Sequence, residues 1–187
     1  MKLAAILTAL ALGAALTPSA RAASVADLAI NDPGLKAAKT LTVTSPKIAS
    51  GGVIPEVYSA YGKGVAPPLH WSNGPYGTRS YALIVEDPDA PLPTPFIHWM
   101  AWNLSAGGLP EGGKLDGMRQ GKLMFVGTVG YMGPRPPPGA PHHYHFQVFA
   151  LDTAPDLPDG AERAQLAQAL KGHVLASGEL VATFQKP

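Results

Sequence analysis

Apolar residues gather in short runs along the chain, and Gly or Pro separates nearly all of these runs. Residues 81–85 and 146–151 are almost continuously apolar, and 97–103 is a third run that contains two tryptophans. Short apolar runs bounded by turn residues are typical of buried strands. Further strands are predicted over 41–45, 122–129 and 179–185. The pattern therefore predicts a mainly β protein.

One segment near the C-terminus has helical periodicity instead. Leu166, Leu170 and Val174 recur at every fourth position, so they share one face of a helix. Asp159 and Glu162 precede them with the spacing of a capping box. We predict a helix here that packs on a sheet.

The first residues have the character of a targeting segment. Lys2 is followed by a mostly apolar run over 3–16 and by the small-residue ending Ala20-Arg21-Ala22, a pattern typical of a secretory signal peptide. The run is shorter than the roughly 20 apolar residues that span a membrane. We predict a signal peptide over 1–22, cleaved after Ala22, in preference to a retained N-terminal anchor. The mature protein would be periplasmic or secreted, without a transmembrane segment.

Composition narrows the partners of the mature chain. Loss of Lys2 and Arg21 lowers the 14 basic residues to 12, against 13 acidic ones, and the basic residues are scattered. A nucleic-acid-binding protein usually shows a basic stripe, so we expect no nucleic acid, and any anion must be bound locally. The chain has no cysteine, which excludes disulfides, thiol catalysis and thiolate metal ligands.

Polar chemistry concentrates at the ends of the predicted strands. Asp87–Pro91 follows the run 81–85, and Pro136–Tyr144 precedes the run 146–151. Proline restricts its own backbone and that of the residue before it. A rigid loop of this kind holds a carboxylate in place with little entropic loss on binding. The two stretches therefore predict a small pocket.

Strand alternation separates the neighbouring histidines of the second stretch. His142, Tyr144 and Phe146 share one face of a strand, whereas His143 and His145 share the other. We assign His142 and Tyr144 to the pocket. His143 and His145 have the spacing of metal ligands on a strand, which leaves a zinc site as an alternative.

The order of these motifs, with His98 between them, resembles the phosphatidylethanolamine-binding protein (PEBP) family, and more narrowly its bacterial Raf kinase inhibitor-like branch of the YbhB/YbcL type. The resemblance covers residues 40 to 185. The other segments that fall in the family's order are Ser45-Pro46, Gly51-Gly52-x-Ile54-Pro55, Pro67-x-Leu69-x-Trp71 and Gly172-His173-Val174-Leu175-Ala176.

The resemblance implies a β-sandwich in which a large antiparallel sheet packs on a smaller one, with a helical segment near the C-terminus. After the signal peptide it gives an N-terminal extension over 23–40 and one domain over 41–187. It implies an anion pocket for phosphate-like groups, including phospholipid headgroups, without cofactor or metal, and it leaves a homodimer as a candidate oligomeric state. The ligand-binding residues that it implies are Asp87, Pro88, His98, Pro136, Pro137, His142 and Tyr144. We add Asp89 as a candidate, with a turn residue that bonds to its own backbone as the alternative.

Two positions depart from the pattern of the resembling family. Tyr61 stands where an acidic residue is common, and Glu86 stands where Asp is usual. Neither change affects the positions of His98 and His142. We expect ligand preference to differ if either residue contributes to the pocket.

Three functions follow from these residues. The leading one is an exported small-ligand-binding protein with an anion pocket and no chemistry of its own. The second is a phosphate or ester hydrolase in which His98 or His142 acts as general base with Asp87, although the chain lacks a Gly-x-Ser-x-Gly nucleophile motif. The third is the histidine-based metal site.

Overall fold

The computed structural model describes residues 21–124 and 127–187. The predicted signal peptide therefore lies outside the described residues, apart from Arg21 and Ala22. Among the described residues, no helix has the length and apolar character to cross a membrane. The elements are, in order, η1 (Val25–Asp27), η2 (Ala29–Asn31), η3 (Pro33–Leu35), β1 (Lys39–Thr40), β2 (Val43–Thr44), η4 (Glu56–Tyr58), β3 (Leu69–Trp71), β4 (Ser80–Asp87), β5 (Phe96–Leu104), β6 (Gly108–Leu109), β7 (Arg119–Gln120), β8 (His142–Leu151), α1 (Arg163–Leu170) and β9 (Val174–Phe184).

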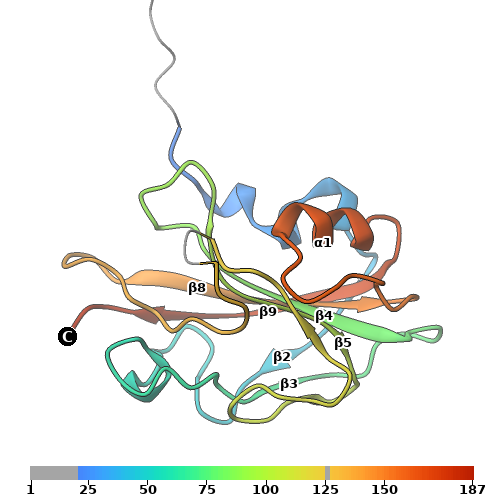
Figure 1. Cartoon of the computed structure of the whole chain (residues 1–187), viewed down its shortest axis with the longest axis horizontal. Helices are drawn as coiled ribbons and strands as arrows, with labels where there is room; N and C mark the ends of the chain where they lie inside the picture. The colour runs from blue at the N-terminus through green and yellow to red at the C-terminus, as the bar shows by residue number, and fades with distance from the viewer. Residues whose placement is uncertain (1–20, 125–126) are drawn as a thin grey trace, which may run out of the picture.

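Two sheets form the frame of the molecule. The larger has the strand order β1-β9-β8-β4-β5-β7, and the smaller has the order β2-β3-β6. All neighbours in the larger sheet are antiparallel except β1 and β9, which are parallel. The small sheet lies against one face of the large sheet, and α1 with the N-terminal turns lies against the other (Figure 1). The prediction of a mainly β protein with a large sheet packed on a smaller one is confirmed.

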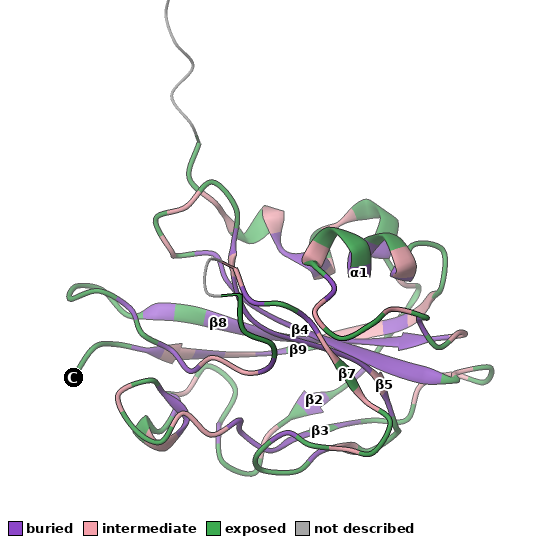
Figure 2. Cartoon of the chain, in the orientation of Figure 1, coloured by how far each residue is buried: buried purple, intermediate pink, exposed green. Residues whose placement is uncertain are grey.

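Strand β4 lies at the centre of the molecule and is buried along all eight residues, as the purple ribbon in Figure 2 shows. Leu83 and Val85 point into the core between the two sheets. Ala82 and Ile84 point into the second core, under the helical layer. Because both faces of β4 are covered, its sequence is a nearly continuous apolar run and does not alternate between apolar and polar residues.

The helical layer is built from both ends of the described chain. Leu166 and Leu170 of α1 pack with Ala29 and Leu35 of the N-terminal turns in the second core. Residue Lys39 then pairs with Ala176 of β9. The segment 23–40 thus packs directly on the large sheet.

The predicted helix is correct in its core and wrong at its end. It ends at Leu170, where Lys171 leaves the helical backbone and Gly172 takes a φ of 79°. Val174 therefore opens β9 and is not a helical position. At the start, Gln165 Oε1 accepts a hydrogen bond of 2.9 Å from the Glu162 N–H, whereas Asp159 accepts one of 2.8 Å from the Gln120 N–H.

Three predicted strands also differ. The run 41–45 gives only Val43–Thr44, because the chain crosses there from the large sheet to the small one: the Leu41 N–H bonds to Ser177, and the Thr42 N–H bonds to Ser72. In the described part of 122–129, only a single bridge between Lys122 and Val129 forms. The strand predicted over 179–185 begins earlier, at Val174.

Candidate functional site

A β-bulge lies at His98, beside the site. Across β4, Val85 is paired with Trp99 and Glu86 with Ile97, so His98 is an extra residue without a partner on that strand. Ile97 points into the core under the helical layer, whereas Trp99 points into the core between the sheets. The extra residue lets His98 and Trp99 lie on the same side of the sheet, where His98 faces the cavity with Asp87, His142 and Tyr144. Bulges commonly redirect a side chain beside a functional site in this way.

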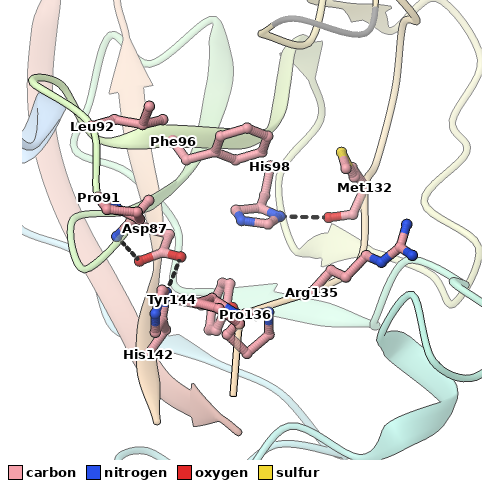
Figure 3. A pocket seen from close by; sticks show the side chains of 12 residues that line it. Asp87, Pro91, Leu92, Phe96, His98, Met132, Arg135, Pro136, His142 and Tyr144 are labelled. Atoms are coloured by element: carbon pink, nitrogen blue, oxygen red, sulfur yellow. Dashed lines mark hydrogen bonds and ion pairs between the residues drawn. The ribbon is translucent and has the colours of Figure 1, made fainter. Parts of the chain in front are cut away.

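The turn after β4 fixes the carboxylate of Asp87. Its Oδ1 accepts hydrogen bonds from the backbone N–H of Asp89 at 2.8 Å and of Ala90 at 3.2 Å. Its Oδ2 lies 2.8 Å from Nδ1 of His142, on the neighbouring strand β8. Both side chains are nearly buried, with 5% of Asp87 and 11% of His142 exposed. The two predicted stretches therefore meet at this carboxylate (Figure 3).

The ring orientation of His98 is fixed by the facing backbone. Its Nδ1 lies 2.8 Å from the carbonyl oxygen of Met132, and the Met132 N–H donates to the His98 carbonyl at 2.8 Å. Because a carbonyl only accepts hydrogen bonds, Nδ1 must carry the proton. Burial lowers the pKa of His98 below its usual value, which favours the neutral ring. Nε2 is then an acceptor, and it lies on the Asp87 side of the ring in Figure 3.

Tyr144 supplies a hydroxyl with no hydrogen-bond partner among the described residues. The side chain is only 1% exposed, and its ring lies edge-on to His98 at a centroid distance of 5.0 Å. Burial raises the pKa of Tyr144, with a further contribution from the charge of Asp87. The hydroxyl therefore stays protonated and can donate. A buried, unpaired hydroxyl calls for an explanation, and a ligand is one.

A cavity of about 350 Å³ joins these groups. Apart from Asp87, the two histidines, Tyr144 and Arg135, its walls are apolar. The lining residues are Asp87, Ala90, Pro91, Leu92, Phe96, His98, Met132, Arg135, Pro136, Pro137, His142 and Tyr144.

Six of the eight predicted ligand-binding residues line this cavity, but Pro88 and Asp89 do not. The turn carries Asp89 away from the cavity, where its carboxylate accepts hydrogen bonds from the backbone and the ring of His143, both at 2.7 Å. Partial burial raises the pKa of Asp89, but these hydrogen bonds outweigh it and hold the pKa below its usual value. The pairing of Asp89 with the exposed His143 leaves neither side chain in the cavity.

The rim opposite Asp87 is anchored by backbone contacts. Gly133 lies so close to residues 58–60 that a Cβ there would come within 2.6 Å of the Ser59 carbonyl carbon. Beyond it, the Tyr61 hydroxyl donates to the Pro136 carbonyl at 3.1 Å, and its ring stacks on Phe184 at 6.1 Å. Tyr61 therefore supports the rim without lining the cavity.

The other departure, Glu86, points to the opposite face of the sheet and is fully buried. Its carboxylate accepts hydrogen bonds from the Ala29 N–H at 2.7 Å, from the Gln147 amide at 2.8 Å and from the Arg163 guanidinium. These bonds join β4, β8, α1 and the N-terminal turns. Glu86 therefore belongs to the framework and not to the cavity.

The metal-site alternative gains no support from the structure. His143 is bonded to Asp89, and His145 to Glu179 at 2.9 Å, so each ring has a separate carboxylate partner. Over residues 21–124 and 127–187, no group of three or more His, Cys, Asp or Glu side chains could hold a metal ion.

Sequence reasoning missed several wall residues. Phe96 lies two positions before His98 on the same strand, so alternation along the sequence could have identified it. In the structure, the ring centroids of Phe96 and His98 are 4.9 Å apart. Arg135 directly precedes the predicted Pro136, is exposed, and has no ion-pair partner among the described residues. Leu92 and Met132 lie in loops, where no periodicity identified them.

Comparison with known proteins agrees with this architecture. The profile of the family described as "Phosphatidylethanolamine-binding protein" matches residues 44–185. The chain belongs to this family. A UPF0098 protein of Pyrococcus horikoshii is 42% identical over 142 residues, which are 71% of this chain and 71% of the relative. A UPF0098 protein of Chlamydia muridarum is 39% identical over 78% of this chain and 99% of its own length.

Solved structures of the family have the same fold. A PEBP homologue of Chlamydia trachomatis superimposes with a TM-score of 0.74 at 37% identity, covering 80% of this chain and 100% of the homologue. YbcL of Escherichia coli, described as a member of the mammalian PEBP family, gives a TM-score of 0.72 at 32% identity, covering 79% and 99%. The resemblance in the motifs is thus confirmed at the level of family and fold.

Proposed function

We propose that this chain is an exported PEBP-family protein that binds a small anion, phosphate-like or phospholipid-headgroup-like, in the cavity beside Asp87, without chemistry of its own. The anion would lie against His98, His142 and Tyr144. The apolar walls would hold the organic part of the ligand.

One observation supports this proposal above the others: the polar atoms of the cavity are only half satisfied. Nδ1 of His98 and Nδ1 of His142 each have a partner, whereas the Tyr144 hydroxyl has none among the described residues. Buried polar groups are normally paired. Among the described residues, no hydrogen bond is made to Nε2 of either histidine or to the Tyr144 hydroxyl. A phosphate group would supply the missing partners, with oxygens for the donors and an O–H for the Nε2 acceptor of His98.

The walls favour an organic phosphate over the bare ion. A volume of about 350 Å³ falls at the lower end of the range of about 300–1,000 Å³ for small-molecule pockets. Leu92, Phe96 and Met132 offer apolar surface beside the polar groups. Arg135 adds a cation without an ion-pair partner among the described residues.

The residues that line the cavity support binding without catalysis. Among the described residues, no Ser, Thr, Cys or Lys side chain lines the cavity. Tyr144, the remaining hydroxyl, has a raised pKa and is a poor nucleophile. If the hydrolase alternative were correct, phosphate or ester substrates would be turned over, and turnover would be lost in His98→Asn and in His142→Gln.

Export is supported by the leader-like sequence and by a relative. A Mycobacterium tuberculosis protein named as a lipoprotein, LppC, is 40% identical over 80% of this chain and 74% of its own length. N-terminal sequencing of the protein from a periplasmic or secreted fraction should give a chain that begins at Ala23. A chain that begins at Met1 would contradict this part of the proposal.

The binding site is tested by a pair of neighbouring histidines. His142 lines the cavity, whereas His143 points away from it and is half exposed. In titration calorimetry with phosphorylethanolamine and with inorganic phosphate, His142→Gln should weaken binding at least tenfold, about 1.4 kcal/mol. His143→Gln should leave the affinity within about twofold. Equal losses in both variants would overturn the site, and the ratio of the two ligands shows whether the organic part contributes.

A further inference from the structure

The two histidines of the cavity differ in the partner of Nδ1. Nδ1 of His142 lies 2.8 Å from the carboxylate of Asp87. His98 has a neutral carbonyl partner, that of Met132, and only 4% of the residue is exposed. In the empty protein the ring of His98 is neutral, and its Nε2 presents a lone pair to the cavity.

A lone pair at that position is unusual for an anion site. The oxygens of an anion are also acceptors, so they repel Nε2 unless a proton lies between the two atoms. That proton has two sources. The ligand brings it as an O–H group, or the protein takes it up from solvent on His98.

The groups that face His98 do not remove this requirement. Asp87 of β4 is paired with His142, and its charge favours a proton on His98. On β8, His142 opposes that proton when it is charged. The Tyr144 ring lies edge-on to His98, and its hydroxyl makes no hydrogen bond to Nε2 or to any other described group. Arg135 lines the cavity from the 131–136 segment and is exposed. Among the described residues, none of these groups donates a hydrogen bond to Nε2 of His98.

We propose that His98 makes anion binding proton-linked, so that the cavity selects anions carrying an O–H group and binds anions without one only together with a proton. This inference rests on the proposed function and adds a rule of selection to it. Hydrogen phosphate and phosphate monoesters in their monoanionic form satisfy the rule. Sulfate and phosphodiesters do not.

The rule has a measurable pH dependence. For sulfate, which does not titrate near neutrality, each proton taken up by the protein changes the affinity by up to about tenfold per pH unit. Sulfate affinity should therefore rise at least tenfold between about pH 7.5 and pH 5.5. Inorganic phosphate should bind more tightly than sulfate at pH 7.5, and the preference should shrink as the pH falls.

Titration calorimetry in two buffers of different ionisation enthalpy counts the protons directly. Sulfate binding at pH 6.5 should take up between about half a proton and one proton. Sulfate binding without proton uptake would overturn the inference, as would an absence of sulfate binding at pH 5.5 in a protein that binds phosphate. If neither phosphorylethanolamine, phosphate nor sulfate binds at any pH, the proposed function itself fails, which is a distinct result.

A matched pair of variants assigns the proton. In His98→Asn the amide N–H can still donate to the Met132 carbonyl, but the side chain cannot be protonated. This variant should lose the pH dependence of sulfate binding and the preference for phosphate, whereas His143→Asn should keep both. Full proton uptake in His98→Asn would overturn the assignment. Should that variant fail to fold, ¹⁵N spectra of the wild-type histidines with sulfate give the same answer: Nε2 of His98 must become protonated.

Discussion

Glu86 and Asp87 are adjacent carboxylates on β4 with opposite surroundings. Glu86 points to the helical layer, is fully buried, and bonds to Ala29, Gln147 and Arg163. Asp87 points to the cavity, where it bonds to His142 and where the buried Tyr144 hydroxyl has no hydrogen-bond partner among the described residues. The comparison shows that burial of charge alone does not identify a site. The cavity is distinguished by a cluster of polar side chains that includes a buried hydroxyl without a hydrogen-bond partner among the described residues.

The largest effect on stability should come from Glu86→Ala. The change leaves the Arg163 guanidinium and the Ala29 N–H without their acceptor, so the free energy of unfolding should fall by about 3 kcal/mol. Urea denaturation measures this loss, and anion affinity of the folded protein should stay within about twofold. Glu179→Ala is the control. Because Glu179 is one-third exposed, its loss should lower the free energy of unfolding by about 1 kcal/mol or less. A loss below about 1 kcal/mol in Glu86→Ala would remove the contrast between the two carboxylates.

Asp87→Ala, unlike Glu86→Ala, should weaken ligand binding as well as stability. It releases His142 and two backbone N–H groups of the turn, so phosphate affinity should fall at least tenfold and stability by about 2 kcal/mol. Calorimetry and urea denaturation on one preparation give both numbers. Unchanged affinity in a folded Asp87→Ala protein would show that the cavity is not the binding site.

Stability should also depend on pH through His98. Burial lowers its pKa in the folded protein, so the unfolded chain binds the proton more readily. The contribution is fully present above the unfolded pKa of about 6.5 and is lost as the pH falls from there toward the folded pKa, by at most about 1.4 kcal/mol per pH unit. Thermal unfolding between pH 8 and pH 5 should show a smaller slope in His98→Asn than in the wild type. Identical slopes would mean that His98 is not held neutral.

The smallest effect should come from Tyr61→Phe, which removes the hydrogen bond to the Pro136 carbonyl and keeps the stacking on Phe184. We expect phosphate affinity to fall about two- to fivefold, in keeping with the loss of one neutral hydrogen bond of about 0.5–1 kcal/mol. Tyr76→Phe is the control, since Tyr76 is fully exposed and far from the cavity lining. An affinity loss shared by both variants would argue against support of the rim by Tyr61.

Local pattern predicted much of this molecule. Alternation along 142–147 placed His142 and Tyr144 on the cavity side and His143 and His145 on the other, because β8 is a regular strand. The apolar runs located β4 and β5, because both strands are covered on two faces.

Features set by tertiary contacts could not be predicted in this way. The bulge that puts His98 and Trp99 on the same side of the sheet depends on the register between β4 and β5. The departure of Asp89 depends on where His143 lies after folding. Arg135 and Met132 entered the cavity because Gly133 allows close backbone contact with residues 58–60.

The most direct test of the central claim uses the six histidines of the chain as internal probes. Ring nitrogens of ¹⁵N-labelled protein are followed by NMR as phosphorylethanolamine is added at constant pH. We expect the signals of Nε2 of His98 and of His142 to shift with the same saturation curve, while those of His70, His143, His145 and His173 stay unchanged. Shifts in those four, with none in His98 and His142, would contradict the central claim.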